Sequence, residues 1–120
     1  MDKIGFENLV STSLKDLPRK FRRRLENIVV VVEDSPSGEI LFQLGMKSPG
    51  ELLGLYQGVP LGERGTGYSN VLPDKILIFK KSIEALCRNE EEISRKVREV
   101  VRHEIGHYFG MSEEELDQLE

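Results

Sequence analysis

The sequence contains one cysteine, Cys87, no tryptophan and only two histidines among its 120 residues. A single cysteine excludes a disulfide within the chain and a zinc finger built from several thiolates. Any metal must therefore be held by histidine and carboxylate side chains. The longest apolar run, Ile28 to Val32, is far too short to span a bilayer. The N-terminal residues lack the continuous apolar segment of a signal peptide, so we expect a cytoplasmic protein without a membrane partner.

The size and charge of the chain are those of an ordinary globular domain. A mass of 13.7 kDa, with 38% hydrophobic and 32% charged residues, predicts one domain over residues 1–120. The net charge of -4 disfavours general nucleic-acid binding. The basic run from Arg19 to Arg24 is a local exception. We favour a solvated helix face for this run, and contact with an acidic partner or nucleic acid is the alternative.

Hydrophobic spacing and turn residues divide the chain into helices and strands. Helices are predicted over residues 3–16, from Pro18 to about residue 28, over 82–88 and over 89–110. Strands are predicted over residues 28–34, where the β-branched run indicates a largely buried strand, within 51–58 and over 75–81. Loops are predicted over 34–39 and 59–74. This order predicts an α+β fold with N-terminal helices and a short mixed sheet.

The segment 89–110 is the strongest predicted helix. Asn89 can cap its first turn, where the acidic residues 90–92 favour the positive end of the helix dipole. Its buried face is predicted to consist of a stripe at helical spacing: Ile93, Val97, Val101, Ile105 and Tyr108.

Both histidines lie near the end of this helix, as His103 and His107 with Glu104 between them. Residues four apart share one helix face, so the two imidazoles can bind one Zn²⁺. Glu104 lies beside that face and is placed to act as general base towards a zinc-activated water. The alternative is that both histidines are ordinary residues near a helix C-terminus, which favours their protonated form.

A catalytic zinc needs a third protein ligand, which must here be a carboxylate. Gly110 can adopt a left-handed conformation and turn the chain back towards the metal, so Glu113 is the first candidate, with Glu114 and Asp117 as alternatives. Ser112 and Glu115 also match a capping box that would open a short last helix. In that second interpretation Glu113 is only a first-turn acid, and the two interpretations are compatible.

Peptide hydrolysis would also need a hydrogen-bond donor for the developing oxyanion. The candidate donors are Tyr56, Arg64, Tyr68 and Tyr108, although packing is the commoner role for each tyrosine. The loop after residue 58 and the strand over 75–81 are the predicted rim and edge for an extended peptide.

The sequence resembles the minimal zincin family of small bacterial metallopeptidases. The resemblance rests on "LPRKFRRRLENIVVVVED", "LLGLYQGVPLGERG", "YSNVLPDKILIFKKSIEALCRNEEE" and "VRHEIGHYFGMSEEEL". His103, Glu104, His107 and Gly110 match the family pattern H-E-x-x-H-x-x-G-x-x-D, whereas Glu113 replaces the final aspartate. The resemblance implies a small α+β zincin with a zinc cofactor, acting on a peptide or protein substrate. A metal-binding module without turnover and a hydrolase of non-peptide amides are the alternative functions.

Overall fold

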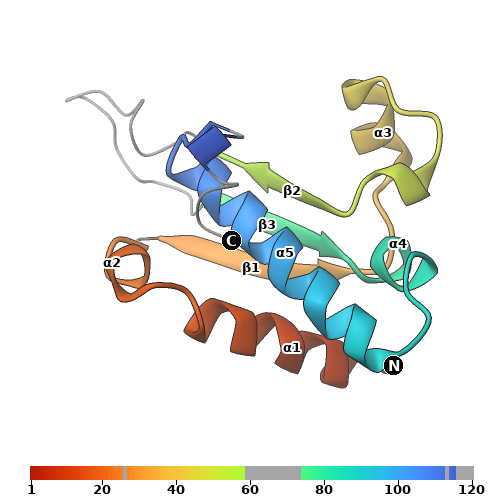
Figure 1. Ribbon diagram of the computed structural model, residues 1–120. Coiled ribbons are helices and arrows are strands. Elements are labelled where there is room, and N and C mark those ends of the chain that lie inside the picture. Colours follow the sequence, from red (N-terminus) through yellow and green to blue (C-terminus); the bar gives the residue numbers. More distant parts are fainter. Residues whose placement is uncertain (26, 59–73, 113, 116–120) are drawn as a thin grey trace.

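A three-stranded mixed sheet with helices packed on one face organises the chain (Figure 1). The computed structural model describes residues 1–25, 27–58, 74–112 and 114–115. The strands are β1 (Ile28–Glu33), β2 (Gly54–Gln57) and β3 (Asp74–Phe79), in the order β1-β3-β2. β1 runs parallel to β3, and β2 runs antiparallel to it. The predicted α+β class and short mixed sheet are thereby confirmed.

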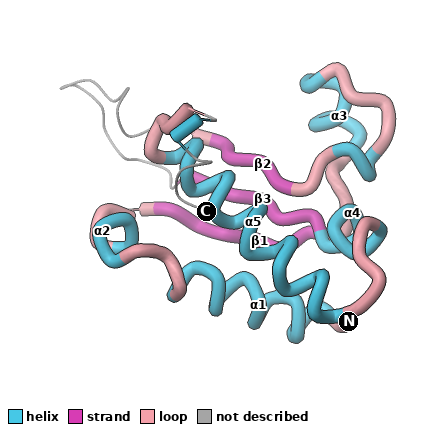
Figure 2. The backbone as a smooth tube through the Cα atoms, viewed as in Figure 1, coloured by secondary structure: helices cyan, strands magenta, loops and turns pink. Residues whose placement is uncertain are grey.

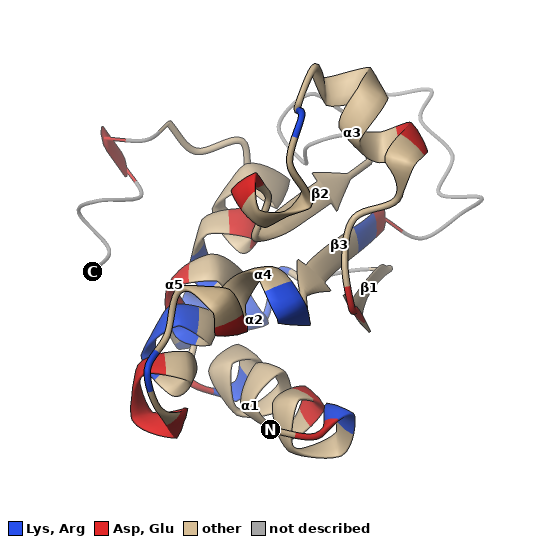
Figure 3. Ribbon diagram, turned by 90° about the vertical axis from the view of Figure 1, so that its right-hand side faces the viewer, with Lys and Arg blue, Asp and Glu red and all other residues tan. Residues whose placement is uncertain are grey.

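Five α-helices and one 3₁₀ turn accompany the sheet in the described residues. They are α1 (Lys3–Lys15), α2 (Arg19–Arg22), α3 (Gly38–Leu44), the 3₁₀ turn η1 (Pro49–Glu51), α4 (Lys80–Ala85) and α5 (Glu90–Tyr108). α1 and α5 lie side by side over one face of the sheet, as the tube in Figure 2 shows. The view turned by 90° places both helices on the same side of β1 and β3 (Figure 3). No helix of the described segments is long and apolar enough to cross a membrane.

The main core lies between these two helices and the sheet. All five residues of the predicted α5 stripe are buried, and all but Tyr108 belong to this core together with Phe6 and Val10 of α1. The sheet contributes Val32, Ile76 and Ile78 to the same cluster. The prediction for α1 is therefore confirmed to within one residue at its end.

The prediction that the strand at residues 28–34 is largely buried was wrong. The β-branched run of β1 was predicted to be largely buried, but Val29 is 42% exposed and only Val32 is buried. In β3, by contrast, every residue from Ile76 to Phe79 is buried. Among the described strands, β1 lies at an edge of the sheet, whereas β3 has a hydrogen-bonded neighbour on both sides, and this difference accounts for their burial. Apolar runs do not by themselves reveal the order of strands in a sheet.

Three predicted boundaries were also wrong. Residues 38–39 belong to α3, whose ends are marked by the Ser37 cap and by Gly45 in the left-handed region. The strand predicted over 75–81 ends at Phe79, and the last two lysines open α4 instead. The second N-terminal helix is only the four-residue α2. Only the first of these boundaries has a side-chain cap; α2 and α4 begin without one, and hydrophobic spacing alone did not place their ends.

Candidate metal centre

Both ends of α5, the helix that carries the histidines, are fixed by local hydrogen bonds. Asn89 Oδ1 accepts a hydrogen bond from the Glu92 amide at 2.9 Å, which confirms the predicted cap. At the other end Gly110 has φ 71°, and its amide donates to the His107 carbonyl at 3.0 Å. The Met111 amide donates to the Gly106 carbonyl at 2.9 Å, which completes a Schellman motif. The left-handed turn predicted at Gly110 is thus present one turn beyond the histidines.

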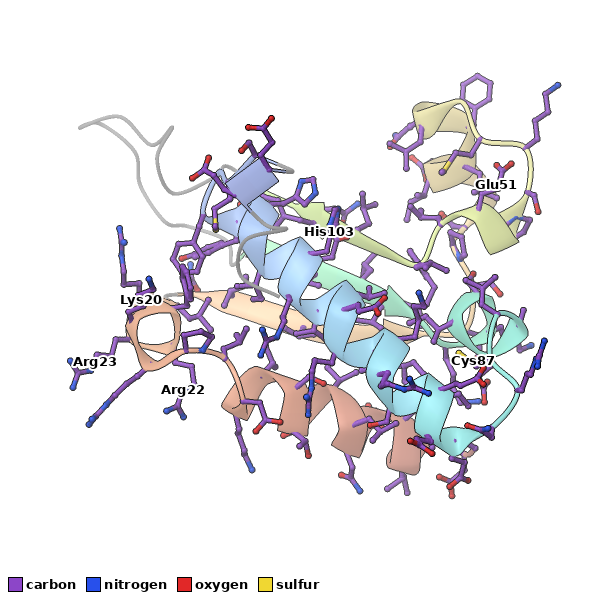
Figure 4. All side chains as sticks on the ribbon, viewed as in Figure 1. Lys20, Arg22, Arg23, Glu51, Cys87 and His103 are labelled. Carbon is purple, nitrogen blue, oxygen red and sulfur yellow. The ribbon has the colours of Figure 1, made fainter. Side chains whose placement is uncertain are left out.

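The two imidazoles converge at the C-terminal part of this helix. His103 Nε2 and His107 Nε2 lie 3.0 Å apart, and the ring centroids are separated by 4.6 Å. His103 is half-buried beside β2, whereas His107 is exposed (Figure 4). The spacing of four residues therefore directs both side chains to one point, as helical geometry requires.

Glu104 lies on the inner side of the histidine pair. Its side chain is only 8% exposed, although it carries a carboxylate. One ligand atom of Glu104 and one from each histidine all fall within 4.8 Å of one another. The structure therefore brings together the three residues that the motif singled out, with the acid on the buried side and the histidines towards solvent.

This donor set fits a zinc ion. Zinc accepts imidazole nitrogen and carboxylate oxygen, and two nitrogens on one tetrahedral ion at about 2.0–2.1 Å lie about 3.3 Å from each other. The observed Nε2–Nε2 separation of 3.0 Å needs only a small adjustment to reach that value. His103 and His107 would therefore hold the ion without rearrangement of α5.

The predicted third ligand, Glu113, lies outside the described residues, as does Asp117. Glu114 is described and exposed. The predicted capping box is confirmed: Ser112 Oγ accepts from the Glu115 amide at 3.2 Å, and Glu115 Oε1 accepts from the Ser112 amide at 3.2 Å.

Two candidate oxyanion donors have structural roles. The Tyr56 hydroxyl donates a 2.6 Å hydrogen bond to Asp74 Oδ2, and the Asp74 side chain is buried. Tyr108 is fully buried, with its ring 6.0 Å from that of Tyr56 in an edge-to-face arrangement. Packing, the commoner role for a tyrosine, is therefore what the structure shows for Tyr108. The other two candidates, Arg64 and Tyr68, lie outside the described residues.

The edge strand beside the metal centre also differs from the prediction. The segment 75–81 was the expected edge, but β3 is central and β2 occupies the edge next to α5. Gly54 at the start of β2 is buried against the helix, and a Cβ there would meet Val100 Cγ1 at 2.7 Å. Sequence reasoning missed Gly54, although a glycine within a predicted strand is a signal of close backbone approach.

The sequence of this chain also matches a known protein family. A profile described as zincin-like metallopeptidase matches residues 25–120. The chain belongs to the zincin-like metallopeptidase family. The match covers the sheet, α5 and the histidine pair, and it confirms the resemblance seen in the sequence. Zincin-like family membership implies a metal, typically zinc, at the site formed by His103, Glu104 and His107. Comparison with curated proteins gives no match.

Proposed function

We propose that this zincin-like chain is a zinc-dependent peptidase in which His103 and His107 bind the metal and Glu104 is the general base. The observation that carries the proposal is the convergence of these three side chains within 4.8 Å at the end of one helix. Membership of the zincin-like metallopeptidase family, whose profile includes these residues, also supports it. Glu113 is proposed as the third ligand, because it follows the left-handed turn at Gly110 by three residues.

The roles of the protein groups follow from their positions. Zinc, when bound, supplies Lewis acidity, which polarises a carbonyl and makes water acidic near neutral pH. Glu104 accepts a proton from the water that attacks the carbonyl carbon. It then returns that proton to the amide nitrogen as the C–N bond breaks, leaving a carboxylic acid and an amine. Glu104 as a residue is only 8% exposed, so few bulk water molecules compete for the proton that it transfers.

Strand β2 is the proposed binding edge for the peptide. It pairs with β3 on one side and, among the described strands, with no strand on the other. An extended substrate can therefore add to its free edge through main-chain hydrogen bonds. Because Gly54 of β2 packs against the side chain of Glu104, such a peptide would lie next to the proposed base.

Metal analysis tests the site directly. We expect about one zinc per chain in protein purified without chelator, loss of zinc in His103→Ala and retention of zinc in Glu104→Gln. The neighbouring pair Glu113→Gln and Glu114→Gln tests the third ligand, and only the first should weaken zinc binding. Wild-type protein that binds no metal at neutral pH would rule the proposal out.

Turnover is the second part of the test. We expect wild-type protein to cleave members of a peptide library and Glu104→Gln to lose about 10²–10⁴-fold in rate with its zinc intact. A zinc-loaded protein that cleaves no peptide would favour the alternatives, either a hydrolase of non-peptide amides or a module without turnover.

The chelator response separates a structural zinc from a catalytic one. Both histidines come from α5, so an ion held by them links no two elements of the described part. The core between α1, α5 and the sheet is also complete without an ion. We therefore expect removal of zinc to change the melting temperature far less than in metal-dependent folds, which unfold without their ion.

A further inference from the structure

Residues 15–24 form a positive pole on an otherwise acidic chain. They include six of the 17 lysine and arginine side chains and one of the 21 acidic side chains. The rest of the sequence therefore has 11 basic and 20 acidic side chains, a formal charge of -9. The match to the zincin-like profile begins at residue 25, so all ten of these residues stand before it and none lies within it.

The fold presents these charges to solvent. Phe21 is the inward residue of α2, with its ring 5.3 Å from that of Phe109 just after α5. The cations around it are all exposed, and Figure 4 shows Lys20, Arg22 and Arg23 extending away from the body of the molecule. Within the described segments, the cations of residues 19–24 form no ion pair. The pole is therefore not neutralised by acids of the described fold.

The basic segment 15–24 lies next to the C-terminal end of α5, the helix that carries both histidines. Phe21 and Leu17 line a small apolar pocket together with Ile105 and Phe109, so α2 is anchored on the C-terminal turns of α5. Arg102 lines the same pocket and precedes the metal ligand His103 in the chain. Consecutive helical residues are about 100° apart around the axis, so the pole and the histidines occupy neighbouring faces of one helix end.

We propose that the basic surface formed by Lys15, Arg19, Lys20, Arg22, Arg23 and Arg24 docks an acidic segment of the polypeptide on which the metal centre acts. The proposal rests on the proposed peptidase function. Guanidinium groups match carboxylates in a bidentate geometry, so an arginine-rich surface suits runs of aspartate and glutamate. A long polyanion such as nucleic acid would extend beyond the pole to a remainder of charge -9, which repels it.

Binding is best measured on metal-free Glu104→Gln protein, so that cleavage does not interfere. The probes are two fluorescent peptides of equal length, one with a run of glutamates and one with glutamines in the same places. The test variant combines R19Q, R22Q and R23Q, which keeps Phe21 in its pocket. The matched control combines K3Q, K47Q and K81Q, which removes three exposed lysine charges elsewhere on the surface.

We expect the glutamate peptide to bind about tenfold more tightly than the glutamine peptide, the sum of a few exposed ion pairs. This preference should vanish in the arginine variant, persist in the lysine variant and disappear in about 1 M salt, where the Debye length is about 3 Å. Equal binding of both peptides, or equal losses in both variants, would overturn the proposal. So would tighter binding of a uridine oligonucleotide or of phosphatidylserine vesicles through the same arginines.

Cleavage by the wild-type protein then separates the two proposals. At peptide concentrations below KM, the glutamate peptide should be cleaved about tenfold faster, in line with its affinity. Peptide binding without cleavage of either peptide would refute the peptidase while leaving recognition of acidic segments in place. Cleavage of both peptides at the same rate would refute the docking role and leave the peptidase intact.

Discussion

Gly54 of β2 lies so close to Glu104 of α5 that no side chain fits between them. A Cβ on Gly54 would approach Glu104 Cγ to 3.2 Å, Val100 Cγ1 to 2.7 Å and the Leu77 carbonyl oxygen to 3.3 Å. A glycine inside a strand normally costs stability, because it orders a flexible backbone and contributes no packing. Here the missing side chain allows the metal helix to rest directly on the edge strand. The proposed general base and the proposed peptide-binding strand are held in contact for that reason.

Gly54→Ala should therefore separate catalysis from metal binding. The added methyl group pushes α5 away from β2, and we expect a loss of about 1–3 kcal/mol in the free energy of unfolding. Turnover should fall by about tenfold or more, because Glu104 shifts relative to a peptide on β2. Zinc affinity should be nearly unchanged, because both histidines move with the same helix. Urea unfolding, peptide kinetics and zinc titration check the three expectations.

The Val100→Ala substitution supplies the control for this prediction. Val100 makes the closest contact with the added methyl group, so truncating it should restore room for Gly54→Ala. The double variant should recover part of the lost stability and turnover relative to the sum of the single variants. Strict additivity of the two changes would show that the contact at 2.7 Å does not set the distance between β2 and α5.

Gly110 and Gly45 form a matched pair for testing the turn after the metal helix. Both end a helix in the left-handed region, with φ 71° and 69° respectively. Alanine costs about 1–2 kcal/mol at such a position, so each substitution should destabilise its own helix end. Only Gly110→Ala should weaken zinc binding, because only that turn leads to the proposed ligand Glu113. Equal zinc affinity in the two variants would contradict Glu113 as a ligand.

Tyr56→Phe tests the structural role of a hydroxyl that was also a candidate for catalysis. The hydroxyl donates to the buried Asp74 carboxylate at 2.6 Å, and a hydrogen bond to a charged group contributes about 1.5–3 kcal/mol. We expect a loss of stability of that order, measured by urea unfolding, with peptide turnover close to that of wild type. Turnover slowed by about a hundredfold or more, with unchanged stability, would instead identify Tyr56 as an oxyanion donor.

The Lys80–Glu84 pair of α4 predicts a dependence of stability on pH. The Lys80 ammonium donates a 2.8 Å hydrogen bond to Glu84, which lowers the pKa of that carboxyl below its ordinary value of 4.5. Because the folded-state pKa is the lower one, the pair stabilises the protein above pH 4.5. This stabilisation disappears as the pH falls through the folded-state pKa.

Glu84→Gln should therefore lower the free energy of unfolding near neutral pH by about 0.2–1 kcal/mol, as partly exposed pairs do. The difference from wild type should shrink in acid unfolding curves below pH 4.5. Glu7→Gln, which removes one carboxylate from the exposed face of α1, is the matched control. A Glu84→Gln effect of constant size across this range would contradict the ionic origin of the stabilisation.

Periodicity and capping residues were enough to predict the metal helix. Three signals predicted it: the apolar stripe from Ile93 to Tyr108, the Asn89 cap and the left-handed turn at Gly110. Each of them can be recognised from residues a few positions apart in the chain. The convergence of His103 and His107 followed from the same local geometry, because a spacing of four residues directs two side chains to one side of any α-helix.

Strand order was not predictable in the same way. The valine-rich segment 28–34 was predicted to be largely buried and the segment 75–81 to be an edge, whereas β1 lies at an edge of the described sheet and β3 at its centre, because hydrogen-bonded neighbours decide which strand is central. The strand order also changes the proposed peptide-binding edge, because β2 and not the segment 75–81 lies at the edge beside α5. Helix α3 was missed for a different reason: its seven residues are too few for a periodic pattern to stand out from a loop.

The sequence by itself thus determined the metal-binding motif, the helix that carries it and the turn that follows it, because each depends on contacts between residues close in the chain. Only the tertiary structure decided that Glu104 is buried, that Gly54 lies against it and that β2, among the described strands, is at the edge beside α5. These features depend on how α5 packs across the sheet, and the periodicity of a single sequence shows which face of a helix is buried but not which distant residues cover it.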